Sequence, residues 1–183
     1  VPGTIVAQDE PIYFWVFDST VANDTPLTSL NATYEVANQA VLEYESCLGG
    51  YPFAVGDPNY GKATMERRNS PTDINYIPEA NNNVLFANAN MRGIQIKQPF
   101  HANGGANQNA MIFNVPSTGY ENVKFAFAAK NEAAADGLTI EYSTTAVTNW
   151  VTTGLTESAL PLTSNYQLFT TDFSGIAEVN NNA

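Results

Sequence analysis

Residues 122–130, with the sequence NVKFAFAAK, decide the fold class that we expect for this chain. Apolar side chains occupy every second position, at Val123, Phe125, Phe127 and Ala129, and small or charged side chains lie between them. Successive side chains of a β-strand point to opposite faces of the sheet. The alternation therefore predicts a strand that packs one face against a hydrophobic core.

Further short segments have the composition or the alternation of strands. They are residues 11–18, 32–36, 40–46, 93–97, 110–115, 138–143, 150–152 and 166–173. Segment 11–18, PIYFWVFD, is apolar almost throughout, which predicts a strand buried on both faces. Asp136-Gly137 is typical of a hairpin turn leading into 138–143, and residues 131–135 are expected to form one helical turn. Together these segments favour an all-β fold, an antiparallel jelly-roll-like β-sandwich.

The length of 183 residues fits one domain of sandwich size, and we expect residues 1–183 to form a single domain. Residues 49–90 differ from the rest because they are rich in Gly, Pro and Asn and show little periodicity. We expect a long loop-rich insertion there, and loops of that length are usually functional or disordered.

Charge and composition exclude several classes of function. The chain has 18 acidic and 7 basic residues, a net charge of −11, which disfavours partners with phosphate backbones or anionic lipid surfaces. We therefore expect no nucleic-acid partner. No apolar run approaches the roughly 20 residues of a membrane helix, so no membrane insertion is expected. One cysteine, Cys47, and one histidine, His101, exclude an internal disulfide and a Cys/His zinc site.

An ordered set of motifs resembles a known domain family. The motifs are YFWVFD (13–18), IQIKQP (94–99), VPSTGY (115–120), FAFAAK (125–130), IEYS (140–143), TDFSGI (171–176) and VNNN (179–182). This set is similar to a jelly-roll domain of secreted, multidomain Bacteroidetes surface proteins, where the domain occurs beside hydrolases and type IX sorting domains. The resemblance implies a non-catalytic module like carbohydrate-binding modules, secreted or on the bacterial cell surface.

The chain departs from the family pattern in two places. Lys97-Gln98-Pro99-Phe100 stands where the family has Arg/Lys-Asn-Pro-Ser, and the final family strand that follows the Asn run is absent before Ala183. A sandwich that lacks its last strand has a sheet edge with unpaired backbone groups. Either the sequence given ends early, or a protein partner fills the edge by β-strand addition.

The candidate ligand site is an outward sheet face with small residues at its centre and amides, ammoniums and a carboxylate around them. Hydroxyl groups of a polysaccharide can hydrogen-bond to such a face, and the basic residues favour an anionic sugar. The candidate residues are Gln95, Lys97, Gln98, Lys130 and Glu141, with Trp150 as a stacking residue. An ordinary solvated sheet face is the alternative interpretation.

Three aspartates are candidate ligands of a structural Ca²⁺, because carboxylate oxygens suit that ion. They are Asp18, Asp24 and Asp172, and solvated turn carboxylates are the alternative.

For catalysis, Glu43 and Glu45 share one face of a strand, and Glu66 stands beside two arginines. Paired carboxylates are what glycoside hydrolysis needs. The chain has no Gly-x-Ser-x-Gly elbow, and His101 lies in a Gly/Asn-rich segment where we expect an exposed loop residue.

The sequence therefore predicts a non-catalytic extracellular module that targets a larger protein to polysaccharide. The alternative is an adhesin or assembly module that binds a protein through an open sheet edge. A glycan-cleaving enzyme is a third reading of the same residues.

Overall fold

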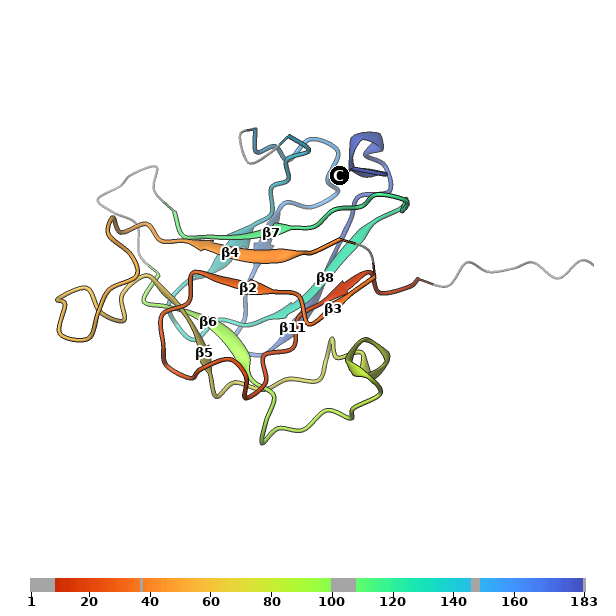
Figure 1. Cartoon of the computed structure of the whole chain (residues 1–183). Helices are drawn as coiled ribbons and strands as arrows, with labels where there is room; N and C mark the ends of the chain where they lie inside the picture. The colour runs from red at the N-terminus through yellow and green to blue at the C-terminus, as the bar shows by residue number, and fades with distance from the viewer. Residues whose placement is uncertain (1–8, 37, 100–107, 146–148, 183) are drawn as a thin grey trace, which may run out of the picture.

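The computed structural model describes residues 9–36, 38–99, 108–145 and 149–182. Within these ranges the chain forms eleven β-strands, all paired antiparallel, and two short 3-10 helices (Figure 1). The all-β, sandwich-like fold class expected from the sequence is confirmed. No helix in the described ranges is long and apolar enough to cross a membrane. His101 lies outside the described residues.

The elements follow one another along the chain as short strands joined by loops. They are β1 (Tyr13–Phe14), β2 (Ser29–Asn31), β3 (Tyr34–Glu35), β4 (Val41–Glu45), β5 (Thr64–Arg68), η1 (Pro78–Asn81), β6 (Gly93–Lys97), β7 (Ala110–Asn114), β8 (Lys124–Ala129), β9 (Gly137–Thr139), β10 (Ala159–Pro161), β11 (Gln167–Asp172) and η2 (Ala177–Val179).

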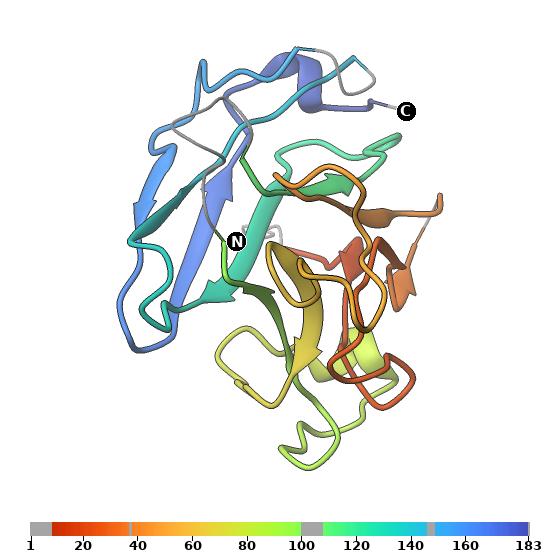
Figure 2. The same cartoon turned by 90° about the vertical axis from the view of Figure 1, so that its left-hand side faces the viewer.

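The strands form five small sheets. β4 pairs with both β2 and β7, β1 pairs with β3, and the remaining pairs are β5–β6, β8–β11 and β9–β10. In Figure 1 the β2-β4-β7 sheet lies above β5 and β6, and β8 runs across them at a steep angle. Figure 2 places β8, β9, β10 and β11 together on one side of the molecule, beside the β5–β6 pair.

The core lies between the β2-β4-β7 sheet and the β5–β6 sheet. Leu42 and Tyr44 of β4 and Met65 of β5 are buried at its centre. Half-buried apolar residues surround them: Trp15, Leu27, Leu30, Tyr51, Ile94, Ile96 and Phe113. Aromatic contacts then extend the core toward β8 and β11, from Phe113 to Phe125, from Phe125 to Phe127 and from Phe127 to Phe169.

The alternation of residues 122–130 is confirmed in β8. Phe125 and Phe127 contact aromatic core residues, while Ala126 and Ala128 face outward opposite Thr170 and Leu168 of β11. The side chain of Leu168 is half-exposed, which agrees with a solvated outer face.

The prediction of a long buried strand at 11–18 is wrong. Only Tyr13–Phe14 pairs as a strand, because side chains take the backbone hydrogen bonds further along. The amide N–H of Val16 donates to the hydroxyl of Thr33 at 2.9 Å, and the carbonyl of Phe17 accepts from the Arg67 side chain at 2.8 Å. The apolar run is therefore an irregular segment whose side chains point in two directions.

The loop-rich stretch expected at 49–90 contains one strand, β5, that the sequence analysis did not predict. The sequence TMERR of β5 has no apolar alternation, yet four of its five residues are buried. Its register with β6 places Met65 opposite Ile96 and Arg67 opposite Ile94. A hydrophobicity pattern does not predict this strand, because several of its buried residues are polar. β2 and β10, each of three residues, also lay outside the expected strands.

The expected hairpin at Asp136-Gly137 is not formed, since β8 pairs with β11 and β9 pairs with β10. Gly137 serves a close approach instead, because a Cβ there would lie 2.9 Å from the carbonyl oxygen of Leu160 on β10. Residues 131–135 form bends and no helix, and the strand expected at 150–152 is reduced to one bridge, between Val151 and Tyr142.

Stability should fall at high pH because of Tyr51. Its hydroxyl donates to the carbonyl of Leu27 at 2.7 Å, and burial raises its pKa to about 12, from about 10 in an unfolded chain. The neutral form is the one that the fold favours, so its stabilising contribution is complete below pH 10 and is lost as the pH rises through 12. In urea unfolding at pH 9 and 11.5, Tyr51→Phe should lose less stability between the two pH values than the unmodified chain. An identical loss in both proteins would contradict this.

Candidate functional site: a charge network on β5 and β6

The two faces of β5 have different environments. Met65 lies in the core, and Arg67 shares its side of the strand. Glu66 and Arg68 point to the opposite side, where Gln95 of β6 lies directly across from Glu66. The site consists of the side of β5 that carries Glu66 and Arg68, together with Arg67 on the other side.

Glu66 is a buried carboxylate between two half-exposed cations. Its side chain is 3% exposed, and Oε1 lies 3.7 Å from Nε of Arg68 and 3.7 Å from Nζ of Lys97. Both separations exceed a hydrogen bond, and Oε1 has no hydrogen-bond partner in the described chain. The two cationic groups, whose side chains are 40% and 38% exposed, therefore lie within about twice 3.7 Å of each other.

Local geometry holds both cations in place. Gly61 has a φ of +74°, and a Cβ on it would lie 3.4 Å from Nζ of Lys97, so the glycine leaves room for that ammonium group. Arg68 donates a short hydrogen bond to the carboxylate of Asp24, and this bond raises the pKa of Arg68. Asp24 therefore positions the guanidinium of Arg68, and the absence of a side chain at Gly61 leaves space for the ammonium group of Lys97.

Arg67 joins three loops and has no carboxylate within ion-pair distance in the described chain. Its Nε donates to the carbonyl of Phe17 at 2.8 Å, one terminal nitrogen to Oδ1 of Asn23 at 2.5 Å, and the other to the carbonyl of Asn90 at 2.7 Å. Burial lowers the pKa of Arg67, and the neighbouring Arg92 lowers it further. The guanidinium fixes the end of the site to the rest of the fold.

A second group of charges adjoins the start of β6. Nζ of Lys130 lies 2.7 Å from Oε1 of Glu132 and 5.1 Å from the ring centroid of Tyr166. The Tyr166 hydroxyl donates to the carbonyl of Ser70, and a Cβ on Gly93 would meet both groups within 3.2 Å. The Lys130 pair is therefore packed against the same end of the β5–β6 sheet, and Glu132 interacts electrostatically with Arg68.

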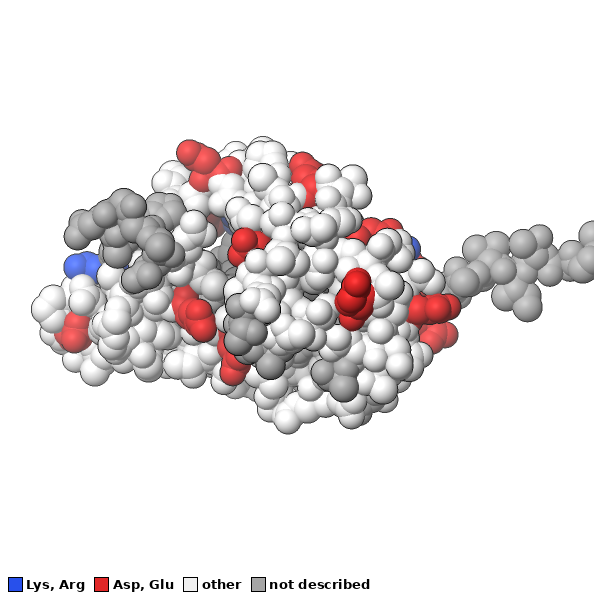
Figure 3. Space-filling view, turned by 90° about the horizontal axis from the view of Figure 1, so that it is seen from above, with Lys and Arg blue, Asp and Glu red and all other residues white. Residues whose placement is uncertain are grey.

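We call these connected residues the charge network. It contains Arg67, Arg68, Arg92, Lys97 and Lys130 with Asp18, Asp24, Glu66 and Glu132. Five basic and four acidic residues give it a net charge of +1, and the rest of the chain, with two basic and fourteen acidic residues, carries −12. The view from above, on the side of β4 and β7, shows acidic side chains in several places and basic ones only at its margins (Figure 3).

The residues predicted to bind a ligand do not lie together on one face in the structure. Gln95 and Lys97 lie on one side of β6, as expected, and Lys130 belongs to the adjoining pair. Gln98 is exposed directly after β6, and its carbonyl accepts from the N–H of Ala63. β6, β8 and β9 belong to three different two-stranded sheets, so the candidate residues do not share the face of one sheet.

Glu141 and Trp150 lie at a different place in the fold. They flank the antiparallel bridge between Tyr142 and Val151, where side chains alternate between two faces. Both are exposed, Trp150 to 41%, and the alternation puts them on the same face of the bridge. In the described chain no hydrogen bond, ion pair or ring contact joins either residue to the charge network, so the pair lies apart from the site.

The three candidate calcium ligands take part in three local interactions. Asp18 accepts from the N–H and hydroxyl of Thr20, which lowers its pKa, and Asp24 pairs with Arg68. Asp172 accepts from the N–H of Ser174, which lowers its pKa. Across the described residues no group of three or more His, Cys, Asp or Glu side chains is arranged to hold a metal ion. Calcium binding stays a prediction.

Glu66, Arg67 and Arg68 are the site residues that sequence reasoning did not place in a ligand site. Their signal was the run Glu66-Arg67-Arg68, since adjacent arginines are rare in a chain with seven basic residues. Among the carboxylates considered for catalysis, Glu43 lies on β4 and accepts from the amide of Asn114 at 2.8 Å, on a different sheet from Glu66.

Comparison of the chain with family models, with curated proteins and with solved structures gave no match. The resemblance to a Bacteroidetes jelly-roll domain therefore stays a prediction.

Proposed function

We propose that this chain is a non-catalytic extracellular module that binds an anionic polysaccharide through Lys97 and Arg68. The observation that carries the proposal is the buried Glu66 carboxylate with a half-exposed cation 3.7 Å away on each side. Two cationic groups held close together on an otherwise acidic protein suit the carboxylate or sulfate groups of an acidic sugar. Gln95 adds an amide that hydrogen-bonds to sugar hydroxyls.

Binding by such a site is weak, and attachment of the module to a larger protein would strengthen it by avidity. Contacts from half-exposed cations contribute about 0.2–1 kcal/mol each and are screened by salt. A role in holding a secreted or cell-surface protein on its substrate fits this range of affinity.

Affinity electrophoresis tests the proposal directly. Gels that contain polygalacturonate, alginate or a sulfated glycan should retard the protein at low salt, and Lys97→Ala should leave any retardation by neutral glycans unchanged. Lys97→Ala should weaken retention about five-fold, as loss of about 1 kcal/mol implies. Lys124→Ala is the matched control, because Lys124 has a similar exposure of 41% and pairs with Asp9 outside the charge network.

Three outcomes would count against the proposal. No retention on any acidic glycan would remove the function, and equal effects of the two lysine variants would remove the site. Release of reducing ends from the same glycans, lost in Glu43→Gln or Glu66→Gln, would show an enzyme.

A protein-binding assembly module is a second candidate, favoured by the edges of the β8–β11 sheet. In the described part of the chain these two strands pair only with each other, and Leu168 on β11 is 51% exposed. Light scattering at rising concentration should then reveal association that a Leu168→Lys variant loses. A monomer at all concentrations would count against this candidate.

A further inference from the structure

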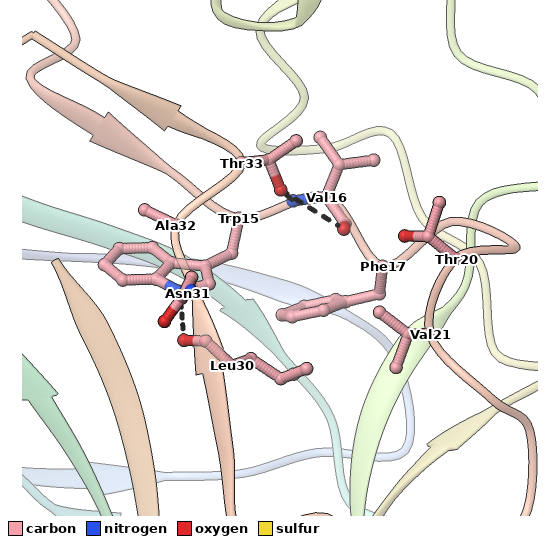
Figure 4. A pocket seen from close by; sticks show the side chains of 9 residues that line it. All are labelled: Trp15, Val16, Phe17, Thr20, Val21, Leu30, Asn31, Ala32 and Thr33. Carbon is pink, nitrogen blue, oxygen red and sulfur yellow. Dashed lines mark hydrogen bonds between the residues drawn. The ribbon is translucent and has the colours of Figure 1, made fainter. Parts of the chain in front are cut away.

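A hollow of about 310 Å³ lies between the segment 15–21 and the edge of β2, away from the cations that carry the proposed function. In Figure 4 the rings of Trp15 and Phe17 extend from the chain on one side, and Val16 extends on the other. In this view Leu30 lies below the two rings, and Val21 lies beside Phe17. The size is at the lower end of ligand pockets, which span about 300–1,000 Å³.

The aromatic wall of the hollow is fixed from behind. The indole N–H of Trp15 donates to the carbonyl of Leu30 at 3.2 Å, and its ring packs edge-on against Phe113 with centroids 5.2 Å apart. The carbonyl of Phe17 accepts both from Arg67, at 2.8 Å, and from the backbone N–H of Arg92, at 3.0 Å. The Trp15 ring and the backbone of Phe17 are thus held in place, so a ligand that stacks on the Trp15 ring costs little conformational entropy there.

The polar groups of the hollow are mostly acceptors. The hydroxyl hydrogen of Thr20 is donated to Asp18 at 2.7 Å, and that of Thr33 is directed to the carbonyl of Val16 at 3.4 Å. The Thr33 hydroxyl also accepts from the N–H of Val16, which leaves it one free lone pair. That lone pair and those of Thr20 can accept from a ligand, and the indole N–H is already used. Asn31, whose side chain has no hydrogen-bond partner in the described chain, supplies both a carbonyl oxygen and an NH₂ group.

This pattern selects a class of ligand. None of the nine lining residues is charged, so nothing there neutralises an ionic ligand, and only the Asn31 amide donates to an anion. A ligand that brings several O–H donors and an apolar face satisfies both the acceptors and the aromatic rings. Sugars have both properties, since the ring C–H groups form an apolar face and the hydroxyls lie around it.

We propose that the hollow between Trp15 and Phe17 is a second binding site, which takes one neutral pyranose unit stacked on the aromatic rings and hydrogen-bonded to Asn31. The site uses none of the cations of the charge network, so it stands whether or not an acidic glycan binds there. Trp15 is thus both a core residue and a ligand contact.

Tryptophan fluorescence gives a direct readout, because the chain has two tryptophans. In a Trp150→Phe background Trp15 is the only one, and its emission reports the hollow. The probes are neutral hexasaccharides of β-1,4-linked glucan, mannan and xylan. At least one should change the emission saturably. Asn31→Ala in the same background should weaken that probe at least five-fold, and Asn165→Ala, at an exposed asparagine between β10 and β11, should leave it unchanged.

Several results would overturn the inference. No saturable change with any of the three sugars would do so, as would equal effects of Asn31→Ala and Asn165→Ala. A change produced by an apolar dye that no sugar displaces would assign the hollow to apolar ligands instead. Lys97→Ala separates the two proposals: it should weaken polygalacturonate binding and leave the Trp15 signal with the neutral sugar intact. Loss of that signal in Lys97→Ala would contradict an independent site.

Discussion

Arg67→Met should lower the free energy of unfolding by about 3 to 4 kcal/mol, because it removes three hydrogen bonds from a buried guanidinium. Arg67 is 5% exposed and its acceptors are the carbonyls of Phe17 and Asn90 and the side chain of Asn23. A hydrogen bond to a charged group contributes about 1.5–3 kcal/mol, and an acceptor left buried and unpaired costs about 1–3 kcal/mol. Relief of the desolvated charge offsets part of this sum.

Arg68→Met is the matched control for this experiment. It makes the same substitution at the next residue, whose side chain is 40% exposed and pairs with the exposed carboxylate of Asp24. Exposed ion pairs contribute about 0–1 kcal/mol, and Lys97 still flanks the buried carboxylate of Glu66 when Arg68 is removed, so the control should lose less than about 2 kcal/mol. Urea unfolding of both variants at pH 7 measures the difference, and equal losses would contradict the role assigned to Arg67.

Leu42→Ala should lower the free energy of unfolding by about 3 kcal/mol or more, within the range of 2.7–5.0 kcal/mol for buried leucines. Leu42 is fully buried on β4, between Leu30 of β2 and Phe113 of β7 in register, and belongs to the central core cluster with Met65. The cavity left by the substitution lies in the cluster that Leu42 shares with Met65 of β5.

The control for the core prediction is Leu168→Ala on β11. The side chain of Leu168 is 51% exposed on the outer face, so its truncation should change the free energy of unfolding by less than about 0.5 kcal/mol. Denaturant unfolding at pH 7 compares the two variants. A loss at Leu42 as small as that at Leu168 would contradict the sandwich core described here.

Local alternation predicts the strands whose buried side chains are apolar. β4, β6, β7, β8 and β11 all lie within segments where apolar residues recur at every second position or nearly so. The same signal identified the polar side of β6 and hence Gln95 and Lys97. Pairing between strands was beyond it, since β8 pairs with β11 across about forty residues and not with the β9 segment that follows it.

β5 shows why the centre of the site could not be predicted. Its buried residues include Thr64, Glu66 and Arg67, which a hydrophobicity pattern assigns to the surface. Arg67 tolerates burial only because carbonyls at Phe17 and Asn90 approach it from positions 50 and 23 residues away. Those partners are set by the tertiary fold, so no local window of sequence contains them.

The carbonyl of Phe17 accepts hydrogen bonds from both the Arg67 side chain and the backbone N–H of Arg92, so this residue connects the charge network to the aromatic hollow. One peptide group anchors the charged end of β5, and the ring of the same residue forms a wall of the aromatic hollow. Loss of the hydrogen bond from Arg67 should therefore shift the ring of Phe17 in the hollow. In Arg67→Met, the fluorescence emission of Trp15 should therefore change, because the Phe17 carbonyl has lost its hydrogen bond from Arg67.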